Sequence, residues 1–206
     1  MPSASSPADF SAAPPRSPVY LEPEALERAC QMERLRRSGP GGQNRNKVDT
    51  AVRFRHPATG IVGEATARRY QGENREIALE RLRVEIALTV RTPVPASLVP
   101  PADDNLGALE DLKRQSDAAT NARASFRWFA RLQGGKIRVA PTSFDYAILV
   151  SEFFDVFEAN DENLSATAAA LETTASQIVR FLGAVPKCLE ELNRRRARRG
   201  LTRLKS

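Results

Sequence analysis

The spacing of hydrophobic and polar residues changes along the chain, and each period predicts a different element. In residues 50–56, TAVRFRH, Ala51, Arg53 and Arg55 alternate with Val52, Phe54 and His56. This period of two is typical of a strand with one solvated face. The turn sequence PATG follows, and residues 61–67, IVGEATA, predict a second strand that returns beside the first as a hairpin. Residues 73–88 place apolar side chains three and four positions apart, which predicts an amphipathic helix. Residues 22–29, EPEALERA, predict a short helix before this unit.

The second half of the chain has the pattern of helices. Residues 93–104 contain four prolines and neither a helical nor a strand period, so we expect a stiff linker there. A long amphipathic helix is expected over residues 105–132. Residues 144–159 are strongly apolar and predict the central helix of this region.

Residues 161–183 predict two short helices joined by a polar turn. Ala169, Val179 and Leu182 have the spacing of a helix-turn-helix, with Thr173 where that motif most often has glycine. Any two packed helices can place small and aliphatic residues in this way. Both interpretations, a nucleic-acid-binding motif and an ordinary helix pair, therefore stay open.

Together these patterns predict an α+β protein. A small β-sheet with a helix forms the first domain, and an all-α C-terminal region with a candidate helix-turn-helix follows. We expect a disordered leader rich in Pro, Ser and Ala, then the first domain, the linker, a helical domain and a basic tail. Their predicted bounds, in that order, are 1–19, 20–92, 93–104, 105–193 and 194–206.

Positive charge is concentrated in two segments of the chain. The 206 residues include 31 Lys and Arg against 25 Asp and Glu, which gives a net charge of +6. Residues 34–47 and 193–206 contain basic side chains and no acidic one. Such patches favour nucleic acid or another anionic surface as the partner.

Several other classes of protein are disfavoured. The chain has no run of eighteen apolar residues and no secretory signal, so we expect no membrane-spanning helix and no membrane partner. Cys30 and Cys188 lack metal-ligand spacing and a neighbouring thiol, which is typical of core cysteines in a reducing cytoplasm. His56 is the only histidine and precedes Pro57, so we expect it to flank a turn rather than to serve as a base. The sequence thus predicts a cytoplasmic protein without metal or cofactor.

The glycine-rich segment RRSGPGGQNRNK, residues 36–47, is the strongest candidate for chemistry. Gly41 and Gly42 permit positive φ angles and a close approach of the main chain to another molecule. The amide and backbone N–H of Gln43 cannot act as a base near neutral pH, but they can orient water and stabilise an oxyanion. Four flanking cations would hold the segment among phosphates: Arg36, Arg37, Arg45 and Lys47. An ester, an oriented water and RNA together suggest peptidyl-tRNA as substrate, whereas the segment alone is also consistent with a glycine turn bearing solvated charges.

The wider sequence resembles a known family. The stretches SGPGGQNRNK, DTAVRFRHPATGI and RYQGENREIALERLR, in this order, resemble the catalytic domain of class I peptide chain release factors and their codon-independent rescue relatives. The resemblance covers about residues 25–90. It implies that Gly41, Gly42 and Gln43 enter the peptidyl transferase centre of the large ribosomal subunit and promote hydrolysis of the peptidyl-tRNA ester. The Gln43 N–H would then stabilise the oxyanion.

The resemblance also implies roles for residues around the tripeptide. The glutamine of this family is often N5-methylated, so Gln43 is the expected modification site and a glutamine methyltransferase an expected partner. Asn46 and Lys47 would contact rRNA or brace the loop.

A second motif of the family lies at the start of the predicted long helix, where Arg69, Gln71 and Asn74 match it. Helix capping and loop bracing are as consistent with these residues as RNA contact is. Two positions depart from the family, because Tyr70 stands where release factors usually have Ser and Arg45 where rescue relatives often have Val.

No codon-reading domain or stop-codon tripeptide is found in the sequence. We therefore expect codon-independent ribosome rescue, with the ribosome, its large-subunit rRNA and peptidyl-tRNA as partners. The alternative is a non-catalytic RNA- or DNA-binding protein that uses the helix-turn-helix and the basic tail. In either case the tail would contact nucleic acid through its arginines: Arg194, Arg195, Arg196, Arg198 and Arg199.

Overall fold

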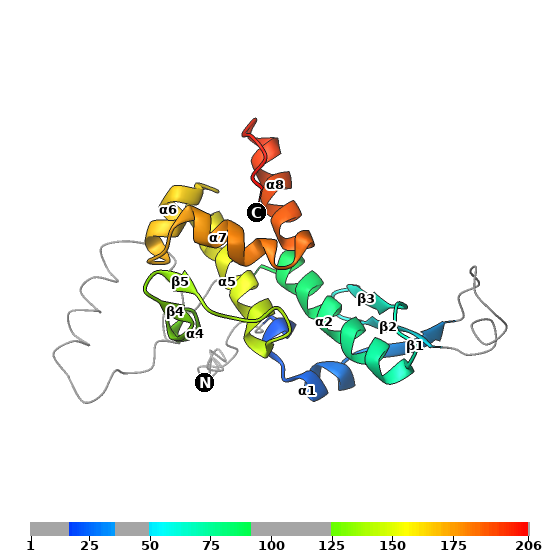
Figure 1. Ribbon diagram of the computed structural model, residues 1–206. Coiled ribbons are helices and arrows are strands. Elements are labelled where there is room, and N and C mark those ends of the chain that lie inside the picture. The colour runs from blue at the N-terminus through cyan, green and yellow to red at the C-terminus, as the bar shows by residue number, and fades with distance from the viewer. Residues whose placement is uncertain (1–16, 36–49, 92–124, 206) are drawn as a thin grey trace, which may run out of the picture.

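The computed structural model describes residues 17–35, 50–91 and 125–205 (Figure 1). Its elements in chain order are η1 (Pro18–Tyr20), α1 (Pro23–Arg28), β1 (Gln31–Leu35), β2 (Ala51–Arg55), β3 (Val62–Ala65), α2 (Gln71–Thr89), α4 (Phe126–Ala130), β4 (Leu132–Gln133), β5 (Lys136–Ile137), α5 (Phe144–Ala159), α6 (Leu164–Ala170), α7 (Ala175–Gly183) and α8 (Pro186–Arg198). The prediction of an α+β protein is confirmed. In the described part of the chain no helix is both long and apolar enough to cross a lipid bilayer.

The first half of the described chain forms a three-stranded antiparallel sheet in the order β1-β2-β3. The predicted hairpin is confirmed as β2 and β3, whose register pairs Val52 with Ala65 and Arg55 with Val62. Strand β1, from Gln31 to Leu35, was not predicted as a strand. Four of its five residues are exposed, so it lacks the alternation of apolar and polar residues that marks a half-buried strand.

Helix α2 covers one face of the sheet and confirms the helix predicted over residues 73–88. Gly63 of β3 lies directly against it. A Cβ atom built on Gly63 would lie 2.3 Å from the Ala78 carbonyl oxygen and 2.4 Å from the Leu82 nitrogen, well inside contact distance. The helix backbone therefore approaches the sheet at a point where only glycine fits.

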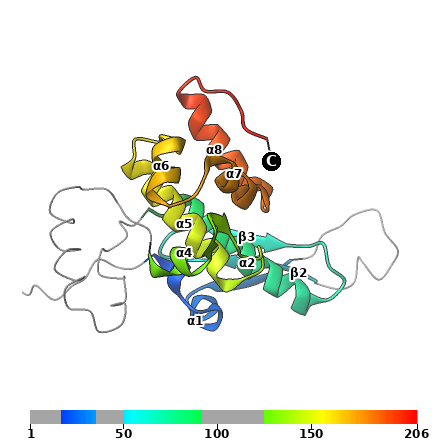
Figure 2. The same cartoon turned by 60° about the vertical axis from the view of Figure 1, so that its left-hand side comes forward.

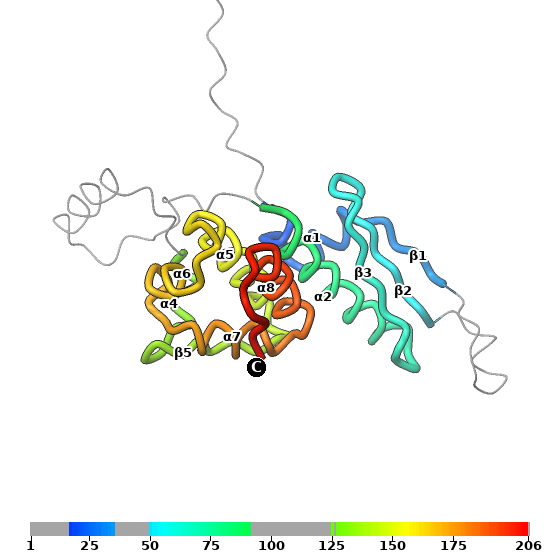
Figure 3. Tube along the Cα trace, turned by 90° about the horizontal axis from the view of Figure 1, so that it is seen from above, coloured from blue at the N-terminus to red at the C-terminus, as the bar shows by residue number. Residues whose placement is uncertain are grey.

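Helix α2 also packs against the helical region, so it lies between the sheet and α5 (Figure 3). Buried Arg83 joins the two parts. Its Nη2 donates to the carbonyl oxygens of Val19 at 3.0 Å and Phe144 at 3.1 Å. Its guanidinium also stacks 4.0 Å above the Phe144 ring. Burial lowers the pKa of Arg83 below its ordinary value.

The predicted central helix of the C-terminal region is confirmed as α5, which is buried along nearly its whole length. Two side-chain hydrogen bonds join the helices of this region. Trp128 Nε1 of α4 donates to the carbonyl of Leu171, just after α6, at 3.0 Å, and the Tyr146 hydroxyl of α5 donates to the Phe181 carbonyl of α7 at 3.1 Å. These anchors hold α4 and α5 against the segment that contains α6 and α7.

The helix predicted over residues 105–132 lies mostly outside the described residues. Its described end differs from the prediction, because Ser125 is extended and its Oγ accepts from the Arg127 N–H, which caps a new helix, α4. After α4 the chain forms the short hairpin β4–β5, which was not predicted. Gly134 and Gly135 make its turn with φ angles of 54° and 72°, in the region that favours glycine.

The two short helices predicted within residues 161–183 are confirmed as α6 and α7, joined by residues 171–174. Thr173 lies in this connection, and its Oγ1 donates to the Gly135 carbonyl of the β4–β5 turn at 2.6 Å. The connection is thereby attached to the hairpin. The helix pair alone does not confirm a nucleic-acid-binding helix-turn-helix.

Helix α5 holds the two described residues that flank segment 92–124. Arg91 pairs with Asp155 at 3.3 Å and donates to the Ser151 carbonyl at 3.3 Å. Ser125 donates from Oγ to Glu152 Oε1 at 2.5 Å. Glu152 is fully buried, and burial raises its pKa even though the bond from Ser125 acts in the opposite direction.

Glu152→Gln should therefore raise the thermal unfolding midpoint at neutral pH. A carboxyl whose pKa is higher in the folded than in the unfolded state contributes most to the free energy of unfolding below its unfolded pKa, near 4.5. This contribution is lost as the pH rises through the pKa of the folded state. Glutamine keeps the acceptor for Ser125 and does not titrate. The gain, about 2–4 °C for each kcal/mol recovered, should shrink as the pH falls toward 4.5. A difference that is the same at every pH would contradict this interpretation.

Candidate functional site

The candidate catalytic segment connects β1 to β2. Leu35, the last residue of β1, pairs with Ala51, the first residue of β2. Antiparallel partners lie about 5 Å apart at Cα, so segment 36–49 leaves and re-enters the sheet at neighbouring points. Every residue predicted for catalysis, modification or RNA contact in this segment lies outside the described residues: Arg36, Arg37, Gly41, Gly42, Gln43, Arg45, Asn46 and Lys47. The structure therefore shows what holds the two ends of the segment.

Asn74 braces the point where the chain re-enters the sheet. Its side chain is fully buried, and Nδ2 donates to the carbonyl oxygens of Thr50 at 2.7 Å and Arg68 at 2.9 Å. Its Oδ1 accepts from the Arg68 N–H at 2.9 Å. One amide thus ties the residue before β2 to the segment that leads into α2. Of the roles considered for Asn74, loop bracing is the one that its position supports.

Asn74→Ala should destabilise the protein, because it leaves three partly buried backbone groups, the Thr50 and Arg68 carbonyls and the Arg68 N–H, without their partner. An unsatisfied buried polar group costs about 1–3 kcal/mol, so urea unfolding should show a loss of at least this size. Gln71→Ala, three residues earlier and partly exposed, is the matched control and should change little. Equal unfolding midpoints for the two variants would contradict the bracing role.

The residues beside Asn74 point outward instead. Arg69 and Tyr70 are exposed, Tyr70 by 62%, and the Arg69 guanidinium lies 5.8 Å from the Tyr70 ring centre. Because Asn74 fixes Arg68 beside Thr50, this cation and aromatic pair lies near the base of segment 36–49. The sequence motif grouped Arg69, Gln71 and Asn74, and the structure separates an inward brace from an outward surface. Tyr70 was noticed only as a departure from the family.

The outer face of the sheet carries a row of ion pairs rather than catalytic groups. Arg53 of β2 donates to Glu64 Oε2 of β3 at 2.8 and 3.0 Å and lies 3.5 Å from Glu33 of β1. These residues are register partners across the three strands. The hydrogen bond to Glu64 is the main reason that the pKa of Arg53 is raised. These ion pairs stabilise the order of the three strands, and Arg53 is paired with Glu64 and Glu33.

The remaining reactive residue types in the described chain have structural roles. His56 is buried, pairs through Nδ1 with Thr59 Oγ1 at 3.0 Å, and forms the turn between β2 and β3, as predicted. Burial, with Glu27 adding to it, raises the pKa of Cys30 to about 11. Burial raises the pKa of Cys188 to about 12. Neither thiol ionises near neutral pH, and residues 17–35, 50–91 and 125–205 contain no acidic, His or Cys group that could hold a metal ion.

Comparison with known proteins decides what this unit is. The family model described as the RF-1 domain matches residues 22–95, which include α1, the three strands, α2 and segment 36–49. Residues 22–95 are an RF-1 domain of the class I release factor family. The match covers the unit whose geometry is described above and ends just after α2.

Curated relatives support the same assignment. Peptide chain release factor 1 of Chloroherpeton thalassium is 48% identical over 63 residues, which are 31% of this chain and 18% of that protein. A probable mitochondrial peptide chain release factor 1 of Caenorhabditis elegans is 50% identical over 69 residues, covering 31% of this chain and 18% of the relative. Peptide chain release factor 2 of Lactiplantibacillus plantarum is 43% identical over 68 residues, which are 33% of this chain and 17% of that protein. The chain spans less than a fifth of the length of these relatives.

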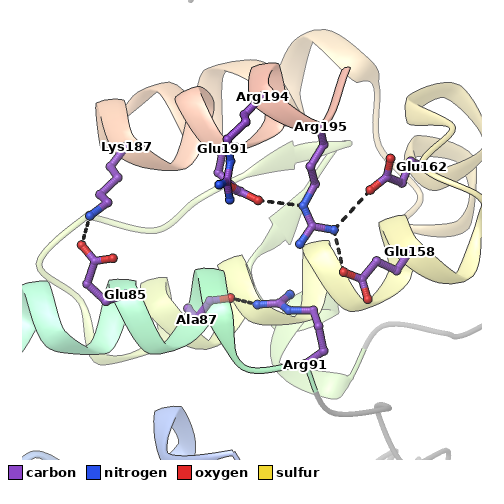
Figure 4. A network of polar contacts seen from close by, with 9 residues as sticks. All are labelled: Glu85, Ala87, Arg91, Glu158, Glu162, Lys187, Glu191, Arg194 and Arg195. Atoms are coloured by element: carbon purple, nitrogen blue, oxygen red, sulfur yellow. Dashed lines mark hydrogen bonds and ion pairs between the residues drawn. The ribbon is translucent and has the colours of Figure 1, made fainter. Parts of the chain in front are cut away.

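The basic C-terminal segment lies outside the RF-1 domain, and Figure 4 shows how its start is held. Arg195, predicted from the charge pattern to contact RNA, is only 9% exposed. It pairs with Glu158 at 2.6 Å, Glu191 at 2.8 Å and Glu162 at 3.4 Å. Burial acts to lower its pKa, but the hydrogen bonds to Glu191 and Glu158 outweigh it and raise the pKa. Arg195 therefore joins α8 to α5, and its position does not support a role in binding RNA.

The other arginines of this segment lie on the surface, although most have a partner. Arg194 pairs with Glu191, and Arg199 donates to the Asp161 carbonyl. Arg196 donates to the Thr202 carbonyl at 3.1 and 3.2 Å. Arg198 is exposed at the last helical position of α8. The chain after α8 turns back beside it, because Asn193 exchanges two hydrogen bonds with the Leu204 backbone (Figure 2).

Proposed function

We propose that this protein hydrolyses the ester bond of peptidyl-tRNA on the ribosome and does so without reading a codon. The observation that carries the proposal is the RF-1 domain match, which includes the Gly-Gly-Gln segment and the elements that hold both of its ends. The relatives that share this domain are named as peptide chain release factors. Gly41, Gly42 and Gln43 are the proposed catalytic residues.

The proposed chemistry uses the substrate's own activated ester. A water molecule attacks the ester carbonyl, the backbone N–H of Gln43 stabilises the negative charge on the oxygen, and the Gln43 side chain orients the water. The C–O bond to the tRNA breaks, giving a peptide with a free carboxylate and a tRNA with a free hydroxyl. Arg36, Arg37, Arg45, Asn46 and Lys47 would hold the segment against rRNA in this step.

Codon independence is the finer part of the proposal. The chain aligns with less than a fifth of each of the three release factors named above, and in the described part the RF-1 domain is followed by a helical region. We propose that this region anchors the protein to rRNA in the cytoplasm, with surface arginines of the C-terminal segment as contacts. These are Arg194, Arg196, Arg198 and Arg199. By family resemblance, Gln43 is also the proposed site for a glutamine methyltransferase.

The test of codon independence is a peptide release assay on ribosomes that differ only in the A site. The protein is added to ribosomes that carry peptidyl-tRNA and present a stop codon, a sense codon or no codon. Release rates that agree within a few fold across the three states are expected. Release that requires a stop codon would contradict codon independence and leave the hydrolytic function standing.

The C-terminal arginines give a separate expected result. Replacing Arg196, Arg198 and Arg199 with glutamine should weaken ribosome binding and flatten its salt dependence, since each lost phosphate contact lowers the log–log slope by about 0.7–0.9. Arg28→Gln, an exposed arginine at the end of α1, is the control for a simple loss of charge. An unchanged slope in the triple variant would show that these side chains are solvated and make no phosphate contact.

The second candidate function is non-catalytic nucleic-acid binding through α6, α7 and the basic segment. The observation in its favour is the pair of short helices with a four-residue connection. Binding of duplex DNA that survives replacement of the cations in segment 36–47 would favour this candidate over hydrolysis.

A further inference from the structure

A basic pocket lies outside the RF-1 domain, between the β4–β5 hairpin and α7. Its volume is about 370 Å³, which is within the range of small-molecule sites. β5 and the residues after it form one wall of the pocket, and α7 forms the other. The two elements pack against each other, and Figure 1 shows them side by side. The proposed hydrolysis does not use any residue of the pocket.

The pocket combines a charged rim with an apolar floor. Lys136, Arg138 and Arg180 are exposed at the rim, while Val139 and Phe181 line the interior. Within the described ranges, none of the three cations has an acidic partner at ion-pair distance. No carboxylate of the described residues neutralises their charge, in contrast to Arg195, which is neutralised by three carboxylates.

The walls of the pocket are fixed by the fold. Thr173 donates to the Gly135 carbonyl at 2.6 Å and so attaches the hairpin turn to the connection before α7. The Phe181 ring packs edge-on against Trp128, with ring centres 5.9 Å apart, and its backbone carbonyl accepts from Tyr146. A pocket held in this way needs little reorganisation when it binds a ligand.

The chemistry of the lining indicates the class of ligand. Cations beside an apolar floor suit a molecule that is anionic on one side and flat and weakly polar on the other. Gln177 lines the same pocket and offers both an amide donor and an acceptor, as the edge of a nucleobase requires. Single-stranded RNA has these features, because its unstacked bases can enter pockets while its phosphates remain at the rim.

We propose that this pocket binds an unpaired nucleotide of single-stranded RNA, with Arg138 and Arg180 on the phosphates and Gln177 on the base edge. Duplex DNA fits less well, because β5 packs along α7 and covers one flank of a nine-residue helix that would otherwise have to enter a major groove. The site is independent of ester hydrolysis, so it should remain in a Gln43→Ala background.

The test measures binding of the full-length protein to a short single-stranded RNA by fluorescence anisotropy over a series of salt concentrations. The variant Arg138→Gln/Arg180→Gln removes two rim charges. The control variant Arg28→Gln/Arg55→Gln removes the same amount of charge elsewhere. Arg28 is exposed on α1, and Arg55 is exposed at the end of β2 that lies far from segment 36–49. With about 0.7 of slope for each single-strand contact, the rim variant should lose about 1.4 of slope and bind about tenfold more weakly near physiological salt, while the control changes little.

Gln177→Ala tests the base contact. It should weaken binding of the RNA and leave binding of an abasic strand of the same length unchanged. Equal losses in the rim and control variants would overturn the proposal. Two further outcomes would also overturn it: binding of duplex DNA as tight as that of the RNA, or displacement of the RNA by polyglutamate at equal charge concentration. Thermal unfolding of each variant at the wild-type midpoint excludes misfolding as the cause.

Discussion

Gln43→Ala and Gly42→Ala are each expected to lower the rate of peptide release by about 100- to 1,000-fold, the typical cost of losing one preorganised polar group at a reacting centre. Alanine at position 43 removes the side-chain amide that orients water. A methyl group at position 42 restricts the backbone angles open to glycine and keeps the main chain away from the ester. The measurement is single-turnover peptide release from ribosomes that carry peptidyl-tRNA.

Ribosome binding of these variants separates chemistry from docking. Neither substitution changes a charge, so the affinity and its salt dependence should match those of the wild type. Asn44→Ala, the neighbouring position to which no role is assigned, is the control and should keep most of the activity. Full release by the Gln43 and Gly42 variants would contradict the assignment of these residues.

Gly63→Ala is expected to destabilise the RF-1 domain more than any other glycine substitution in its described part. The added Cβ would meet the Ala78 oxygen at 2.3 Å, the Leu82 nitrogen at 2.4 Å and the Leu82 Cβ at 2.6 Å. None of these atoms is the flexible end of a side chain, so helix and sheet must separate. Overpacking of this kind costs about 1–3 kcal/mol and at times more, which urea unfolding would detect.

Gly72→Ala provides a matched control for this substitution. Gly72 is exposed in the first turn of α2, and a Cβ there meets nothing within 4 Å. Alanine is favoured over glycine in a helix by about 0.5–1 kcal/mol, so this variant should be as stable as the wild type or more stable. The same methyl group thus has opposite effects nine residues apart, and equal unfolding midpoints would contradict the packing of α2 on β3.

The sequence predicted those elements that bury one face. Residues 50–56 alternate because β2 has a buried face against α2, and residues 144–159 are apolar because α5 is buried along nearly its whole length. Strand β1 was missed because an exposed edge strand has no hydrophobic period. The β4–β5 hairpin was missed because strands of two residues are too short to show one.

The residues of the candidate site also differ in how far the sequence could predict their roles. The Gly-Gly-Gln tripeptide and its flanking charges are local in sequence, so the sequence alone was enough to select them. Asn74 and Arg195 depend on partners far along the chain: Thr50 is 24 residues from Asn74, and Glu158 is 37 residues from Arg195. Charge and residue type cannot show whether such a side chain points into the fold or out of it, and for Arg195 the prediction from charge failed for this reason.

The most direct test of the proposed function is a release assay with isolated large ribosomal subunits that carry peptidyl-tRNA, run beside intact stalled ribosomes. Large subunits contain the peptidyl transferase centre and no codon, so a codon-independent hydrolase that acts there needs no other component. We expect the wild-type protein to free the peptide from at least one of the two substrates, and the Gln43→Ala variant to free it from neither at a comparable rate. No release by the wild-type protein from either substrate, with binding to both demonstrated, would contradict the proposed hydrolysis.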